Sequence, residues 1–128
     1  MLKILYIALG GALGSLSRYW LSGLIHFYFS SSFPRGTLIV NLTGSLIIGL
    51  LWGISDIVII NPNIKLFFFV GILGSFTTFS TFTLENFNLL RENEYGLVLL
   101  NVLLSLILGI TLVFAGFFIS RQMINLTR

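Results

Sequence analysis

The sequence predicts an all-helical membrane protein built as a single four-helix domain over residues 1–128. Hydrophobic residues make up 56% of the chain and charged residues only 9%, whereas a soluble domain usually carries about 25% charged residues. A chain of this length cannot hide so much apolar surface in a water-exposed fold. Long apolar runs, without sustained alternation of apolar and polar residues, favour membrane helices over a membrane β-barrel.

Charge-free runs divide the chain into four predicted spans. A helix needs roughly 20 apolar residues to cross a bilayer, and short Ser-, Pro- and Asn-rich breaks separate the runs, the first of them from Ser30 to Arg35. The predicted spans are residues 3–28, 36–56, 65–89 and 95–121, in the order of the chain.

The basic residues show almost no preference for one side of the membrane. With four spans, Lys3, Lys65, Arg121 and Arg128 share one side, and Arg18, Arg35 and Arg91 share the other. Lys and Arg in cytoplasmic loops set orientation, so this balance fits either a weakly biased single topology or insertion both ways as an antiparallel dimer. The net charge of +3 is too small and scattered to indicate nucleic-acid binding.

In the first span, Gly10, Gly14 and Arg18 follow one another at steps of four. Small residues on one face let membrane helices approach closely, which predicts a packing role for the glycines. A cation within a span is costly. Arg18 is therefore predicted either to reach toward the membrane surface or to form an electropositive vestibule that draws anions.

Polar and small residues recur every four positions in the second and fourth spans, and so lie along one face of each helix. They are Thr37, Asn41, Ser45, Gly49 and Gly53 in the second span, and Asn101, Ser105 and Gly109 in the fourth. Gly49 and Gly53 are predicted to pack helices together. Asn41 fits packing and pore lining equally well.

The third span has the least ordinary composition, because hydroxyl residues crowd the segment that follows Gly74. Their side chains can satisfy a broken backbone or donate to an ion. We expect a helix break between Gly74 and Thr78, where freed carbonyls can bind a cation.

Phe76, Phe79 and Phe82 lie three residues apart and are predicted to share a face. Such rings usually pack or face lipid, although their positive edges can also face an anion. Glu85 follows one turn later, where a solvated carboxylate at the end of the helix is the ordinary expectation.

No catalytic triad or phosphate-binding loop is visible, and no carboxylate lies deep in a span, so the sequence gives almost no support to an enzyme. There is no Cys, and His26 is the single His, which excludes a multi-His metal site within one chain. Uncharged donor-rich stripes with one buried Arg suit passage of a small anion. The alternatives are a small dual-topology multidrug transporter, for which Glu85 is the only candidate carboxylate, and a membrane accessory subunit without transport activity.

Three motifs occur in order along the chain: Gly10-Gly11-x-x-Gly14-x-x-x-Arg18-Tyr19, Gly36-Thr37-Leu38-Ile39-Val40-Asn41-x-x-Gly44, and Gly74-x-x-Thr77-Thr78-Phe79-Ser80-Thr81-Phe82-x-x-Glu85. With these motifs the chain resembles the bacterial fluoride channels of the Fluc/CrcB family over nearly its whole length. The resemblance implies a passive, fluoride-selective channel of the bacterial inner membrane that exports fluoride and lowers its toxicity. It also implies an antiparallel dual-topology homodimer with two pores at the subunit interface.

The resemblance further implies roles for single residues. The fluoride pathway would comprise Phe79, Phe82, Asn41, Ser80, Thr81, Thr37 and Glu85. Arg18 would belong to the vestibule, and the carbonyls of Gly74 and Thr77 from both subunits would hold one structural Na⁺. Gly109 departs from the family pattern, because some members carry a serine there, and Ser105 is a candidate to replace it. Ser75 stands where a glycine is common.

Overall fold

The computed structural model describes residues 1–29 and 31–126. Ser30, the first residue of the predicted break before the second span, and Arg128, which the charge comparison included, lie outside the described residues. The described part is all-helical and contains no strand. Its elements are α1 (Leu2–Tyr28), α2 (Arg35–Ile57), α3 (Pro62–Lys65), η1 (Leu66–Leu73), α4 (Gly74–Phe76), α5 (Phe79–Arg91) and α6 (Tyr95–Leu126).

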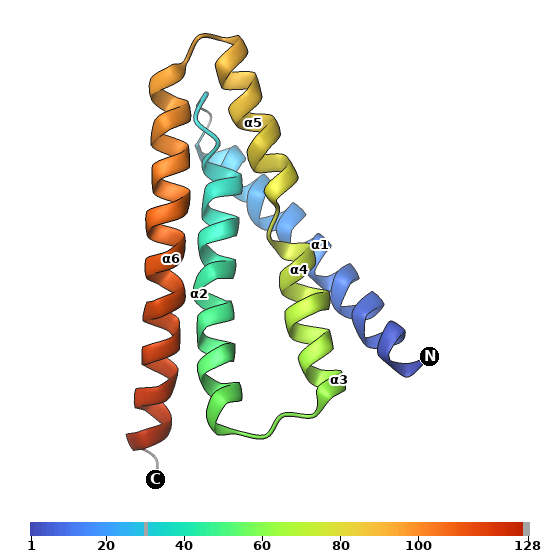
Figure 1. The fold of residues 1–128 in the computed structure, drawn as a ribbon. Coiled ribbons are helices and arrows are strands. Elements are labelled where there is room, and N and C mark those ends of the chain that lie inside the picture. The colour runs from blue at the N-terminus through green and yellow to red at the C-terminus, as the bar shows by residue number, and fades with distance from the viewer. Residues whose placement is uncertain (30, 127–128) are drawn as a thin grey trace.

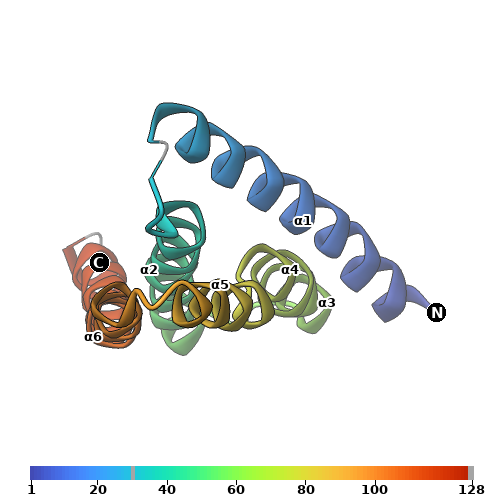
Figure 2. The ribbon, with the colours of Figure 1, turned by 90° about the horizontal axis from the view of Figure 1, so that it is seen from above.

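Two helix pairs form the bundle. Helices α2 and α6 run side by side, and α1 packs against η1 and α4 on the side away from α6 (Figures 1 and 2). Elements α3, η1 and α4 follow one another as a single helical segment, and α5 continues beyond it after a short extended stretch (Figure 1). In η1 the helix widens into a π-helix of eight residues, a rare form that the sequence pattern does not predict.

Local sequence explains where several elements begin and end. Asn61 caps α3 by accepting a hydrogen bond from the Asn63 amide at 2.9 Å, and Pro62 occupies the first turn, where its missing N–H costs nothing. The turn between α5 and α6 places Asn93 at φ 62°. Asn tolerates this left-handed conformation better than most residues do.

Close backbone approach at glycines confirms the predicted packing role of the small residues. A Cβ at Gly49 would overlap the carbonyl of Val113 on α6, and one at Gly53 would overlap Ser120. On the other side of the bundle, a Cβ at Gly14 would overlap the carbonyl of Ile72 in η1. Both helix pairs therefore pack more closely than any larger residue at these positions would allow.

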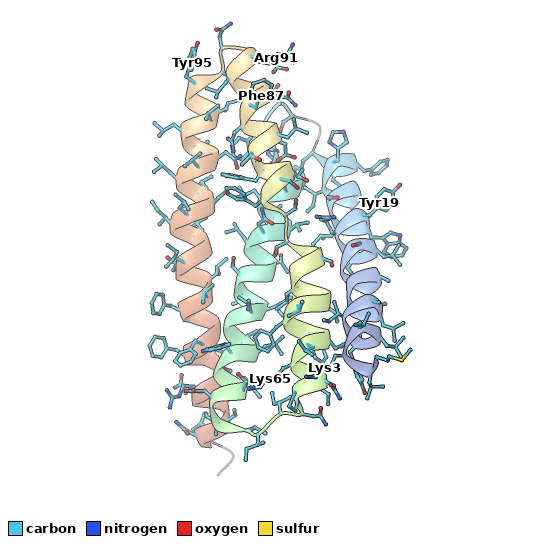
Figure 3. The ribbon with its side chains drawn as sticks, turned by 45° about the vertical axis from the view of Figure 1, so that its right-hand side comes forward. Lys3, Tyr19, Lys65, Phe87, Arg91 and Tyr95 are labelled. Carbon is cyan, nitrogen blue, oxygen red and sulfur yellow. The ribbon has the colours of Figure 1, made fainter. Side chains whose placement is uncertain are left out.

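In the described part of the chain, three helical segments are long and apolar enough to cross a membrane: Arg35–Ile57, Pro62–Arg91 and Tyr95–Leu126. They match the predicted second, third and fourth spans. The predicted first span forms helix α1 but is not among the three, since Arg18 and several Gly and Ser residues lower its hydropathy. Lys3 and Lys65 lie at one end of the bundle and Arg91 at the other, as the charge count assumed (Figure 3).

The single chain buries little of its apolar surface. Among the described residues, six apolar side chains form its core: Ile25, Leu38, Val40, Leu73, Phe76 and Leu89. Most other large apolar side chains are exposed, including residues on every long helix. Such a surface needs a partner or lipid to cover it.

Candidate functional site: the break between α4 and α5

The predicted break in the third span is present. Helix α4 ends at Phe76, Thr77 and Thr78 adopt extended backbone conformations, and α5 begins at Phe79. The break explains why one prediction was wrong. Phe76 does not share a face with Phe79 and Phe82, because the chain changes direction between them: Phe76 is 7% exposed, whereas Phe79 is 76% exposed.

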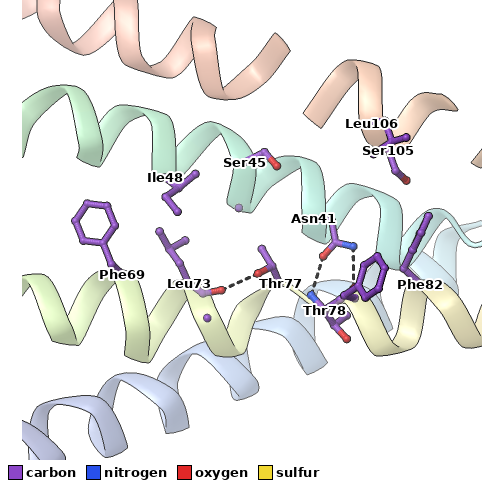
Figure 4. A pocket seen from close by; sticks show the side chains of 13 residues that line it. Asn41, Ser45, Ile48, Phe69, Leu73, Thr77, Thr78, Phe82, Ser105 and Leu106 are labelled. Carbon is purple, nitrogen blue, oxygen red and sulfur yellow. Dashed lines mark hydrogen bonds between the residues drawn. The ribbon is translucent and has the colours of Figure 1, made fainter. Parts of the chain in front are cut away.

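Side chains satisfy the backbone groups that the break frees. The Thr77 hydroxyl donates to the Leu73 carbonyl at 2.9 Å, and the Thr78 hydroxyl caps α5 by accepting from the Thr81 amide at 3.2 Å. Asn41 of α2 bonds Thr78 twice (Figure 4). Its Oδ1 accepts from the Thr78 amide at 2.8 Å, and its Nδ2 donates to the Thr78 carbonyl at 3.1 Å.

A cavity of about 420 Å³ opens beside the break. Its polar lining comes mainly from α2, the break and α6, with Asn41, Thr78 and Ser105 among the contributors. The rings of Phe79 and Phe82 line it as well, with centroids 5.8 Å apart and planes tilted by 32°. The cavity thus combines amide and hydroxyl donors with aromatic rings, which is the mixture predicted for an anion path.

A second cavity of about 630 Å³ lies where α1, α2 and α5 meet. Thr37, Thr81 and Glu85 line it. The Thr37 hydroxyl donates to Glu85 Oε1 at 2.6 Å, while Glu85 Oε2 is buried and no donor in the described part of the chain reaches it. Glu85 is therefore a partly buried, bonded carboxylate, and not the solvated one that its position suggested.

The predicted site residues are thus divided between two cavities. The first holds Gly74, Thr77, Asn41, Phe79 and Phe82. The second holds Thr37, Thr81 and Glu85.

Hydroxyl contacts link the two groups of residues. The Thr78 hydroxyl lies 3.1 Å from the Thr81 hydroxyl and 3.3 Å from that of Ser80. Ser80 itself is exposed and lines neither cavity. A row of hydroxyl groups therefore passes from one cavity toward the other along α5.

The basic residues that line the second cavity are not the one that the sequence singled out. Arg18 is half-buried and lines none of the described cavities. Arg35 and His26 line the second cavity, together with the acidic Glu92. Arg35 lies 5.5 Å from the centre of the Phe29 ring. Sequence reasoning singled out Arg18 because it interrupts a span, whereas Arg35 was taken as an ordinary loop residue.

Sequence reasoning also missed a buried pair of amides between α5 and α6. Asn101 is 1% exposed, and its Nδ2 donates to Asn86 Oδ1 at 3.2 Å. Asn86 in turn donates to the Phe82 carbonyl at 2.8 Å. The four-residue stripe pointed to Asn101, but Asn86 lies in a polar stretch where nothing distinguished it.

Ser105 and Gly109 differ in their relation to the first cavity. Ser105 lines it, and Gly109 is not among the lining residues. A Cβ at Gly109 would lie 3.6 Å from the Ser45 hydroxyl, at an ordinary contact distance. The position could thus hold a serine without a clash, and in this chain the serine nearest the cavity on α6 is Ser105.

The described residues contain no group of three His, Asp or Glu side chains that could hold a metal ion. Backbone carbonyls at the break are the other possible ligands. In an unbroken helix the Thr78 amide would bond the Gly74 carbonyl, but here it donates to Asn41. Carbonyls freed in this way suit a hard cation such as Na⁺.

Fold and site together define a small helical membrane protein whose broken helix lines two cavities, the first without charged side chains and the second with Arg35, Glu85 and Glu92. Comparison with known proteins places it more narrowly. The family described as "CrcB-like protein, Camphor Resistance (CrcB)" matches residues 5–117, and the chain belongs to this family.

Several curated relatives carry the name "Fluoride-specific ion channel FluC". The protein of Thermococcus kodakarensis is 46% identical over 121 residues, which cover 91% of this chain and 94% of the relative. That of Parabacteroides distasonis is 40% identical over 128 residues, the full length of both chains. That of Geobacter sp. strain M21 is 43% identical over 124 residues, which cover 96% of this chain and the whole relative.

Proposed function

We propose that this chain is a passive, fluoride-selective anion channel. Membership of the CrcB family and relatives named for a fluoride-specific channel along the full chain support the substrate. The observation that carries the mechanism is the cavity at the break, where an amide, hydroxyls and two phenylalanine rings meet. A channel of this kind needs no catalytic group, in agreement with the sequence.

Fluoride holds its water tightly, so a selective pore must replace that water with other donors. The second hydrogen of Asn41 Nδ2 and the hydroxyls of Ser80 and Thr81 can supply hydrogen bonds to the anion. The edges of Phe79 and Phe82 offer partial positive charge without a competing acceptor. These groups attract an anion without trapping it as a fixed cation would.

The second cavity serves as the vestibule in this proposal. Arg35 and His26 line it together with Glu92, whereas Arg18 is not among its lining residues. The bond from Thr37 occupies one carboxylate oxygen of Glu85 within this cavity before an anion arrives. Hydroxyls of Thr37 and Thr81 then lead from the vestibule toward the phenylalanine rings.

A second copy of the chain completes the pore in this proposal. The exposed Phe79 and the wide apolar surface of the single chain support such an assembly. The near-equal division of Lys and Arg supports insertion in both orientations, and hence an antiparallel homodimer with four spans per subunit and two pores at the interface. Lipid would cover the remaining apolar helix faces.

One Na⁺ between the broken helices of the two subunits fits the carbonyl ligands that the chain offers. The carbonyls of Gly74 and Thr77 would hold it, because the diverted Thr78 amide leaves the Gly74 carbonyl without its helical donor. The ion would supply positive charge that draws the two broken helices together. Its role is structural, and the anion path does not run through it.

In a bacterial inner membrane such a channel would remove fluoride from the cytoplasm. Neutral HF enters from acidic surroundings and dissociates inside, where the anion is trapped. A membrane potential that is negative inside drives the anion out by about 2.3 kcal/mol per charge per 100 mV. Export therefore needs neither ATP nor proton coupling, and it lowers fluoride toxicity.

Anion efflux from liposomes tests this function. The purified protein is reconstituted in vesicles loaded with KF or KCl, valinomycin releases the potential, and a selective electrode reads each anion. Fast fluoride efflux without chloride efflux is expected. Efflux that requires a proton gradient would favour a multidrug-type transporter, and no efflux from a folded dimer in Na⁺ buffer would favour an accessory subunit.

A further inference from the structure

The amide of Asn41 is joined to the backbone of the break by two reciprocal hydrogen bonds. Oδ1 accepts from the Thr78 amide at 2.8 Å and Nδ2 donates to the Thr78 carbonyl at 3.1 Å. The partners fix the orientation of the amide group, because a flipped amide would set donor against donor and acceptor against acceptor. One Nδ2 hydrogen remains free of these bonds and belongs to a group that lines the cavity.

The bond to the Thr78 amide has a consequence for the helix itself. In a continuous helix that amide would close the turn onto the Gly74 carbonyl. Asn41 offers it another acceptor and so allows Thr77 and Thr78 to remain extended, with ψ values of 155° and 120°. The same bond leaves the Gly74 carbonyl available to another ligand.

Helix α5 depends on few other contacts. It packs modestly on α6 and touches α2 still less, so its position relative to α2 rests largely on two polar links. These are the bonds from Asn41 to Thr78 and from Thr37 to Glu85, made by residues four apart on one face of α2. Phe79 directly follows Thr78, and its ring position therefore depends on the Asn41 link.

We infer that Asn41 is a positioning residue that holds the third span broken, and in that way sets both the Phe79 ring and the freed Gly74 carbonyl. This role is additional to hydrogen bonding of an anion, and it rests on the proposed channel function only for its consequence on transport. It predicts that losing the amide alters the backbone at Thr78, whereas a residue that only lines the cavity would leave the backbone unchanged.

The test compares three variants of the full-length protein, each labelled with ¹³C at threonine. The Cα and Cβ chemical shifts of Thr77 and Thr78 separate extended from helical backbone. In Asn41→Leu both bonds are lost, and the Thr78 shifts are expected to leave their extended values. Ser45→Ala is the matched control, since Ser45 lines the same cavity one turn along α2 but has no bond to the break.

Asn41→Asp keeps the oxygen that accepts from the Thr78 amide and loses only the donor to the Thr78 carbonyl, so the Thr78 shifts are expected to move less than for loss of both bonds while fluoride efflux falls. This variant also covers the case in which Asn41→Leu does not fold. A second readout is the rise in melting temperature between Na⁺-free and Na⁺ buffer, which should be lost in Asn41→Leu and kept in Ser45→Ala.

Unchanged Thr78 shifts in folded Asn41→Leu would overturn the inference, as would shifts in Asn41→Asp that move as far as those expected for loss of both bonds. Wild-type protein that carries no fluoride would instead refute the proposed function, and the chemical shifts would still decide the role of Asn41.

Discussion

Gly49→Ala is expected to destabilise the protein through the contact between α2 and α6. An added Cβ would overlap the Val113 carbonyl, which belongs to a helix backbone and cannot rotate away as a side chain can. The two helices must separate or shift, and overpacking of this kind costs about 1–3 kcal/mol of unfolding free energy.

Gly23→Ala is the matched control and should change the unfolding free energy in the opposite direction. Gly23 lies within α1, and an added Cβ there meets nothing within 4 Å. Replacing a helical glycine by alanine without steric conflict stabilises by about 0.5–1 kcal/mol. The difference in free energy between the two variants should thus reach at least about 1.5 kcal/mol, taking the lower end of both ranges.

Equilibrium unfolding in mixed micelles with increasing SDS, followed by circular dichroism, measures both free energies. The reasoning would be refuted if Gly49→Ala were as stable as the wild type, or if both variants changed in the same direction by the same amount. The first result would mean that α2 and α6 can move apart at little cost. The second would mean that helix propensity alone determines the change in unfolding free energy in both variants.

Three further predictions concern the site. Thr37→Val keeps the side-chain shape but removes the donor to Glu85 Oε1, and should lower fluoride efflux about tenfold or more, since a hydrogen bond to a charged group contributes about 1.5–3 kcal/mol. Phe82→Ile should abolish efflux while size-exclusion chromatography still shows a dimer, and normal efflux in this variant would remove the ring from the pathway. Replacing Na⁺ by a large organic cation should lower the melting temperature of the wild type, whereas an unchanged value would contradict a structural Na⁺.

The break and the packing stripes could be predicted because their signals are local. Hydroxyl residues after Gly74 indicated a segment that satisfies its own backbone, and glycines at steps of four indicated close helix contacts. Helix η1 offered no such signal, because its sequence is uniformly apolar and fits an α-helix equally well. The hydropathy of α1 was also harder to judge, since a single Arg18 offsets a long apolar run.

Contacts between distant residues could not be predicted in the same way. The bond from Thr37 to Glu85 joins residues 48 apart in the chain, and it changed Glu85 from an expected solvated carboxylate into a bonded one. Phe76 was grouped with Phe79 because helical spacing was assumed to continue through the break. The link from Asn41 to Thr78 likewise depends on how α2 faces the break.

The central claim is a passive pore selective for fluoride, and its reversal potential in a planar bilayer tests it most directly. With fluoride on both sides at a tenfold gradient, the current should reverse about 59 mV from zero, as expected for a singly charged ion. Replacing other anions by chloride, or adding a pH gradient, should leave that potential unchanged. A reversal potential that follows chloride or protons, or no current at all from folded dimer in Na⁺, would contradict the account.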